Sequence, residues 1–94
     1  MYKVMIIDDD RGAIENIYHV FDWRRLNVTE VIKLDNAFNL VEKIKQETPD
    51  IVMIDIELGE VSGLNIIEQC KNSGSNALFV IISGHYDFLY AKKQ

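Results

Sequence analysis

The stretch Ile51-Val-Met-Ile-Asp55 decides the fold of this chain, because four apolar residues lead directly into a carboxylate. Pro49 and Asp50 precede it, and the segment 57–63, with two glycines, follows as an expected flexible loop. A short apolar run between turn residues is typical of a strand buried on both faces of a parallel sheet. In such sheets the reactive groups lie beyond the carboxyl ends of the strands. We therefore expect Asp55 to lie at the functional edge of a sheet.

Strand-like and helix-like patterns alternate along the whole chain. Apolar or mixed runs predict four strands, at 4–7, 28–34, 51–55 and 77–82. Apolar residues at helical spacing predict helices at 14–21 and 37–47, a third with Leu64, Ile67 and Cys70 on its apolar face, and a fourth from about Tyr86. This alternation favours an α/β fold over a helical bundle.

The order of elements predicts one domain over residues 1–94, with a flavodoxin-like, doubly wound parallel sheet. Right-handed crossovers and a strand order of 2-1-3-4 place the first strand beside the third. Asp8 and Asp9 follow the first strand, Asp55 closes the third, and Ser83 follows the fourth. We therefore predict that these four side chains meet at one edge of the sheet.

Composition argues against several classes of protein. The formal net charge of −5 and the pI of about 4.8 argue against nucleic-acid binding by this segment and against docking to an anionic membrane. Cys70 is the single cysteine, so an intrachain disulfide is impossible. No apolar stretch approaches the roughly 20 residues of a membrane span, and acids at Asp8 come too early for a signal peptide. We expect a soluble, cytoplasmic protein.

The predicted edge gathers carboxylates, which raise one another's pKa values unless a cation neutralises them. Oxygen ligands that remain open to water suit Mg²⁺. A bound Mg²⁺ would shield an incoming phosphoryl group from Asp55, and an aspartate carboxylate can act as a covalent nucleophile. Ser83 could donate a hydrogen bond to the transferred phosphoryl oxygens. For Asp10, a solvated place at the start of a helix is as good an interpretation as a place in the site.

Together these motifs resemble the receiver domain of two-component response regulators, over all 94 residues. Ile6-Ile-Asp-Asp-Asp10 resembles the acidic pair that closes the first strand of that family, and Ile54-Asp55 resembles its phosphoacceptor. Gly63 falls on the glycine of the following loop. Val80-Ile-Ile-Ser-Gly84 resembles the hydroxyl residue and small neighbour after the fourth strand. The resemblance implies a CheY-like fold and a phosphodonor that is a sensor histidine kinase.

The resemblance also assigns roles at the site. It implies that Asp55 is phosphorylated and that Ser83 is the switch hydroxyl. The implied Mg²⁺ ligands are Asp9 directly, Asp8 mainly through water, Asp55, and the backbone carbonyl of Glu57. Such a receiver promotes its own phosphorylation without being a turnover enzyme.

Two further stretches, Phe21-Asp-Trp23 and 83–93, resemble the branch of the family with an AraC-type helix-turn-helix output domain. The implied function is control of transcription, with DNA bound only through an output domain that is absent from these 94 residues.

The chain departs from the family pattern in two places. Gly59 stands where the family usually has proline, so we expect a looser loop after Asp55. The chain also ends before the family's fifth helix and its fifth strand, which bears a lysine that contacts the phosphoryl group, so we expect a C-terminally truncated receiver. The apolar stretch 77–83 would then be an outer edge, and such edges pair with other chains. We therefore predict self-association through this edge, by strand pairing or by exchange of elements, or else poor solubility.

Two alternatives stay open. A receiver fold that no longer signals by phosphate could serve only as a protein-pairing module, and the missing lysine keeps this interpretation open. Asp8-x-Asp10 with Ser83 also resembles the first motifs of haloacid-dehalogenase-type phosphatases, with Asp8 as nucleophile and Asp10 as acid. Gly12 replaces the Thr or Val expected there, and Asp55 would have no role. The receiver interpretation accounts for more of the sequence.

Overall fold

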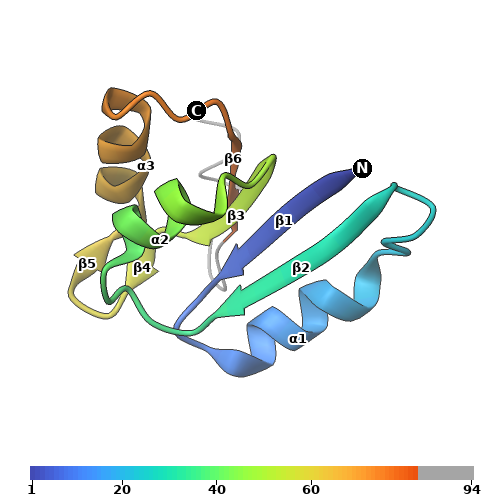
Figure 1. The fold of residues 1–94 in the computed structure, drawn as a ribbon. Helices are drawn as coiled ribbons and strands as arrows, with labels where there is room; N and C mark the ends of the chain where they lie inside the picture. Colours follow the sequence, from blue (N-terminus) through green and yellow to red (C-terminus); the bar gives the residue numbers. More distant parts are fainter. Residues whose placement is uncertain (83–94) are drawn as a thin grey trace.

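The computed structural model describes residues 1–82, which form a central parallel sheet flanked by helices (Figure 1). In chain order the elements are β1 (Tyr2–Ile7), α1 (Arg11–Val20), β2 (Val28–Leu34), α2 (Leu40–Glu47), β3 (Ile51–Asp55), β4 (Glu57–Leu58), β5 (Val61–Ser62), α3 (Gly63–Asn72) and β6 (Leu78–Ile82). The predicted fourth helix and Ser83 lie outside the described residues. Within residues 1–82, no helix is long and apolar enough to cross a membrane.

The four long strands pair in the order β2-β1-β3-β6, and every pairing is parallel. Because β6 is the fourth long strand, this order confirms the predicted 2-1-3-4 arrangement of a flavodoxin-like sheet. Ile7 lies opposite Ile54, and Asp55 lies opposite Ile82. The carboxyl ends of β1, β3 and β6 therefore meet at the same edge.

Helices lie on both faces of the sheet, with α2 and α3 on one face and α1 on the other (Figure 1). The larger core cluster packs under α2 and α3 and includes Met5, Ile7, Leu40, Ile44, Val52, Ile54, Ile66 and Cys70. The smaller cluster lies under α1 and consists of Val4, Ile6, Ile14 and Val28. Successive strand residues point to opposite faces, so β1 contributes to both clusters. For this reason its sequence is continuously apolar rather than alternating.

Helix α2 starts at Leu40, three residues later than predicted. Asn39 precedes it in a left-handed conformation with a φ of 50°, and its side chain makes no capping hydrogen bond. A residue in that conformation cannot continue a right-handed helix, so the apolar spacing from residue 37 overestimates the helix.

The segment 57–63 forms a small β-hairpin in place of the expected loop. Its strands β4 and β5 are antiparallel, with Leu58 opposite Val61. Leu58 is buried in the larger core cluster and anchors the hairpin. Ser62 then caps α3, since its hydroxyl accepts a hydrogen bond from the amide of Asn65. The hairpin thus connects the end of β3 to the start of α3 by ordered structure.

Helix α3 is rotated relative to the prediction. Its buried residues are Gly63, Ile66 and Cys70, whereas Leu64 is exposed and Ile67 only partly buried. The predicted apolar face was therefore correct at Cys70, correct in part at Ile67, which packs against the larger core cluster, and wrong at Leu64, where Gly63 and Ile66 are buried instead. The close approach of Gly63 to the backbone of β3, described below, fixes this rotation.

Candidate functional site

Three aspartates meet at the carboxyl edge of the sheet. Asp8 and Asp9 follow β1, and Asp55 ends β3, which neighbours β1. Each offers a carboxylate oxygen, and these three atoms all lie within 4.8 Å of one another. The structure thus brings together three of the four side chains that the sequence placed here. Closely spaced carboxylate oxygens are the donors that Mg²⁺ prefers.

The three carboxylates differ in exposure and in hydrogen bonding. Asp8 is 4% exposed, and its Oδ1 accepts a hydrogen bond of 2.9 Å from the amide of Asp10. Asp55 is 9% exposed, whereas Asp9 is exposed. The Oδ2 atom of Asp9 accepts a hydrogen bond of 3.2 Å from the amide of Gly59 in the β4–β5 turn. Two buried carboxylates and one exposed carboxylate thus form a single cluster, which we call the acidic recess.

The recess raises the pKa values of its buried carboxyl groups. Burial is the main cause of a rise in the pKa of Asp8 from 3.8 to about 6; the amide of Asp10 opposes this rise, and the charges of Asp55 and Asp9 add to it. Burial likewise raises the pKa of Asp55, against the effect of backbone amides in the two residues that follow it. A divalent cation would favour the ionised carboxylates. The donor set therefore fits Mg²⁺.

Asp10 has a structural role. It is the N-cap of α1, and its Oδ1 accepts hydrogen bonds from the amides of Gly12 at 2.8 Å and Ala13 at 3.3 Å. Of the two interpretations left open for Asp10, the structure favours the helix start. The phosphatase alternative loses support, because it needs Asp10 as an acid beside Asp8.

Gly63 lies directly behind Asp55. A Cβ atom built on Gly63 would lie 2.0 Å from the backbone oxygen of Asp55, which is far closer than any van der Waals contact. Its amide also donates a hydrogen bond to the carbonyl of Ile56. The start of α3 can therefore pack against the end of β3 only because residue 63 has no side chain.

The remaining residues expected at the site fall into two groups. Glu57 begins β4, two residues after Asp55, and is exposed. Ser83 lies outside the described residues, although Ile82, directly before it in sequence, pairs with Asp55. The sequence analysis missed Gly59, for which it expected only a looser loop. The sequence did contain a signal for the hydrogen bond to Asp9. Glycine has a backbone N–H that can donate a hydrogen bond, whereas the proline usual in the family at this position has none.

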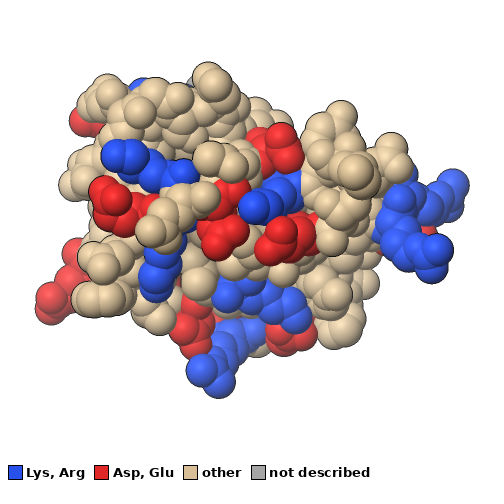
Figure 2. All heavy atoms as spheres, viewed as in Figure 1, with Lys and Arg blue, Asp and Glu red and all other residues tan. Residues whose placement is uncertain are grey.

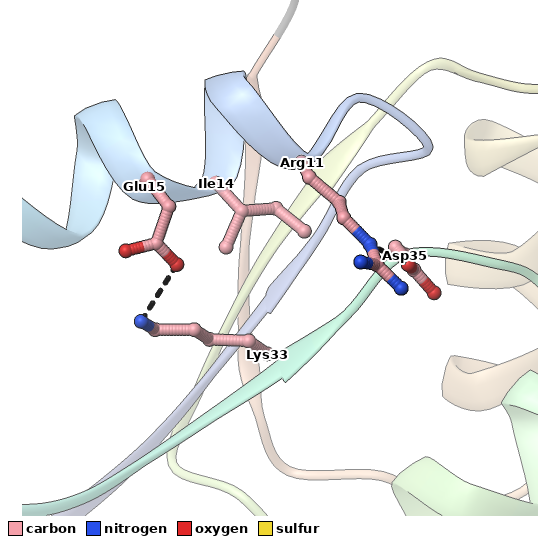
Figure 3. Close-up of a pocket in the computed structure, with 5 residues that line it drawn as sticks. All are labelled: Arg11, Ile14, Glu15, Lys33 and Asp35. Atoms are coloured by element: carbon pink, nitrogen blue, oxygen red, sulfur yellow. Dashed lines mark hydrogen bonds and ion pairs between the residues drawn. The ribbon is translucent and has the colours of Figure 1, made fainter.

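A hollow lies between α1 and β2, lined by Arg11, Ile14, Glu15, Lys33 and Asp35 (Figure 3). Its charged groups pair with one another: Arg11 Nε lies 2.6 Å from Asp35, and Lys33 Nζ lies 2.7 Å from Glu15. Figure 2 shows acidic and basic side chains interspersed over the face viewed there. The hollow therefore presents paired surface charges and differs from the acidic recess.

Comparison with known proteins identifies the class to which this fold and site belong. Residues 4–94 match the response regulator receiver domain family, so the chain belongs to that family. This confirms the resemblance seen in the sequence. The family consists of receiver domains and is not in general a family of turnover enzymes.

Individual relatives are transcriptional regulators. The chain is 29% identical over 93 residues to the transcriptional regulatory protein YesN of Bacillus subtilis, covering 99% of this chain and 25% of YesN. The receiver domain of the response regulator AraT from Geobacillus stearothermophilus is similar in structure, with a TM-score of 0.82 and 24% identity, covering 98% of this chain and 71% of that one. A two-component transcriptional regulator AraC from Clostridium phytofermentans also has a TM-score of 0.82, at 16% identity, covering 99% and 72% of the two chains. The chain thus spans about a quarter of the length of YesN.

Proposed function

We propose that this domain accepts a phosphoryl group on Asp55 from the phosphohistidine of a sensor histidine kinase, with Mg²⁺ as cofactor. The observation that carries the proposal is the meeting of Asp8, Asp9 and Asp55 at the end of two neighbouring strands. Membership of the receiver family supports the same role.

The proposed reaction is a simple transfer. A carboxylate oxygen of Asp55 attacks the phosphorus atom, the P–N bond to the kinase histidine breaks, and an acyl phosphate forms on Asp55. The leaving nitrogen keeps the electron pair of that bond. When bound, Mg²⁺ would reduce the repulsion between the phosphoryl group and the carboxylates.

Each acid has a proposed part in holding the cation. Asp9 would bind it directly, Asp8 mainly through water, and Asp55 and the backbone carbonyl of Glu57 would complete the protein ligands. Ser83 would donate its hydroxyl hydrogen bond to the phosphoryl oxygens. Membership of the receiver family and the position of Asp55 at the end of β3 support assigning nucleophilic attack to Asp55 rather than Asp8.

We further propose that phosphorylation controls a transcriptional output, because the curated relative YesN is named as a transcriptional regulatory protein. DNA would be bound by an output domain outside these 94 residues, in keeping with the net charge of −5 here. We propose a cytoplasmic location, where a sensor histidine kinase presents its phosphorylated domain.

A second candidate function is protein pairing, either independent of phosphate or in addition to it. Within residues 1–82, strand β6 pairs with β3 alone, and it lies at the end of the sheet. Leu78 at its start is 62% exposed. An apolar strand at the end of a sheet favours pairing with a second copy of the chain.

The first experiment is an intact-mass measurement after incubation with a small-molecule phosphodonor and Mg²⁺. We expect a gain of one phosphoryl group in the wild type and none in Asp55→Asn, which preserves size and removes the nucleophile. No gain, even in a chain extended through the fifth strand, would favour the pairing module. A gain in Asp55→Asn as well would place the acceptor elsewhere.

Light scattering at high protein concentration tests pairing separately. We expect dimers or larger species for the wild type, and a shift toward monomer when a charge is placed at the exposed start of β6 by Leu78→Lys. A single monomeric species in the wild type would overturn the pairing proposal without affecting phosphorylation.

A further inference from the structure

One hydrogen bond joins the acidic recess to the β4–β5 hairpin. The amide of Gly59 donates to Oδ2 of Asp9 over 3.2 Å, across fifty residues of sequence. Asp9 is otherwise the exposed member of the three acids. An exposed aspartate side chain rotates freely unless a partner holds it, so this contact restricts the Asp9 carboxylate.

The hairpin holds the Gly59 amide in a defined place. Gly59 and Glu60 form the two-residue turn between Leu58 and Val61, and Gly59 adopts a φ of +64°. Glycine at the first central position with positive φ is typical of a tight hairpin turn. Leu58, the residue before it, is 4% exposed and fixed in the core. The donor is therefore anchored through its own backbone.

We propose that the Gly59 amide positions the Asp9 carboxylate for the cation of the acidic recess, and thereby ties the β4–β5 hairpin to the occupancy of the site. A carboxylate has two oxygens, so a donor on Oδ2 leaves Oδ1 for a cation. Hydrogen bonds to metal ligands orient them, and their loss weakens metal binding about 10- to 100-fold. This inference rests on the proposed Mg²⁺ site and deepens it.

Glycine at position 59 permits both the turn and the hydrogen bond, whereas proline would permit neither. Proline has no amide hydrogen and cannot adopt a positive φ, so it could make neither this turn nor this bond. The glycine that suggested a looser loop thus adds a contact between the loop and a proposed ligand. Any movement of the hairpin would displace Asp9, and a cation bound to Asp9 would in turn steady the hairpin.

The test compares Mg²⁺ affinity in variants that separate the N–H group from the backbone angle. Gly59→Ala and Gly59→Pro both disfavour the positive φ, but only the proline removes the N–H. In a third protein the amide between Leu58 and Gly59 is replaced by an ester, which removes the N–H and keeps a residue that adopts the positive φ without strain. We expect the Mg²⁺ dissociation constant to rise about tenfold in the ester protein and in Gly59→Pro. It should rise less in Gly59→Ala.

A spectroscopic readout separates positioning from a general loss of structure. In the wild type we expect the ¹H–¹⁵N resonance of the Gly59 amide to shift on Mg²⁺ titration. In Asp9→Ala without Mg²⁺, this amide should exchange with solvent faster while the amides of β3 keep their protection.

The outcomes distinguish this inference from the proposed function. If the wild type and the ester protein bind Mg²⁺ equally well, the positioning role is overturned and the Mg²⁺ site stands. If the wild type binds no Mg²⁺, the proposed cofactor and this inference both fail. A Gly59 amide that exchanges at the same rate with and without the Asp9 carboxylate also overturns the positioning role.

Discussion

The two ends of the central sheet differ in whether their charged groups have partners. At the carboxyl end, Asp8, Asp9 and Asp55 crowd together, and no lysine or arginine of residues 1–82 forms an ion pair with them. At the amino end, Lys3 Nζ donates to the carbonyl oxygen of Glu47 at 2.8 Å and lies 3.3 Å from its Oε1. The Lys3 amide donates to Oδ2 of Asp50 at 2.8 Å.

The amino end of the sheet contributes to stability, whereas the carboxyl end reduces it. Charges at the amino end have partners, so they join β1 to α2 and to the residue directly before β3 without unbalanced repulsion. At the carboxyl end, burial of carboxylates and, to a smaller extent, their mutual repulsion oppose folding with these groups ionised, as the raised pKa of Asp8 indicates. A protein tolerates such repulsion where a ligand of opposite charge can offset it. The arrangement therefore supports the proposal that the carboxyl end holds the functional site.

We expect the largest change in the free energy of unfolding when the packing of Gly63 against the end of β3 is disrupted. Gly63→Ala would place a Cβ 2.0 Å from the backbone oxygen of Asp55, and neither backbone can yield easily. We expect the free energy of unfolding in urea to fall by about 3 kcal/mol or more. Gly74→Ala is the matched control, because nothing lies within 4 Å of its Cβ position and only its positive φ is penalised, by about 1 kcal/mol. Equal losses in the two variants would contradict this account of Gly63.

The next effect concerns pH. The folded protein holds the Asp8 proton up to about pH 6, whereas an ordinary aspartate has a pKa of 3.8. The folded state thus binds more protons between these values, so the free energy of unfolding falls as pH rises through them. Without Mg²⁺, we expect the wild type to lose up to about 3 kcal/mol between about pH 4 and about pH 7, relative to Asp8→Asn. Saturating Mg²⁺ at neutral pH should restore most of the loss, and parallel pH curves would exclude Asp8 as the cause.

A smaller effect should come from the amino end. Asp50→Ala removes the acceptor of the Lys3 amide, and we expect the free energy of unfolding to fall by about 1 kcal/mol. Mg²⁺ affinity should stay at its wild-type value, because Asp50 lies at the opposite end of the strands. Asp50→Asn keeps an acceptor oxygen and serves as the control. A change in Mg²⁺ affinity would show that the two ends are coupled.

The smallest effect is a stabilising one, also at the amino end. Thr48 adopts a φ of 45° directly before Pro49, and both its branched side chain and the proline disfavour that conformation. We expect Thr48→Asn to raise the free energy of unfolding by about 0.5–1 kcal/mol, because asparagine tolerates left-handed angles better. Thr48→Val, equally branched, should give no gain.

The sheet and the acidic site were predictable because they depend on strong local patterns. The runs at 4–7 and 51–54 are apolar on both faces, which is typical of central strands covered on both sides. Because the two strands are parallel neighbours, Asp8 and Asp55 at their carboxyl ends meet at the same edge of the sheet. Charge crowding then follows from the carboxylates alone.

The hairpin and the orientation of α3 were not predictable in the same way. Strands of two residues, such as β4 and β5, are too short to show a period. The face of α3 depends on how closely Gly63 approaches Asp55, which is a tertiary contact. The bond between Gly59 and Asp9 joins parts of the chain that no local pattern connects.

The position of β1 between β2 and β3 has a consequence for synthesis on the ribosome. The first acids of the site emerge early, but the strand that brings Asp55 to them ends only at residue 55. Until then β1 has one of its two neighbours, and the long-range pairing that completes it is slow to form. The cluster of carboxylates is thus assembled in the same step that buries the core around β1, so a nascent chain acquires its acidic site only when β3 joins the sheet.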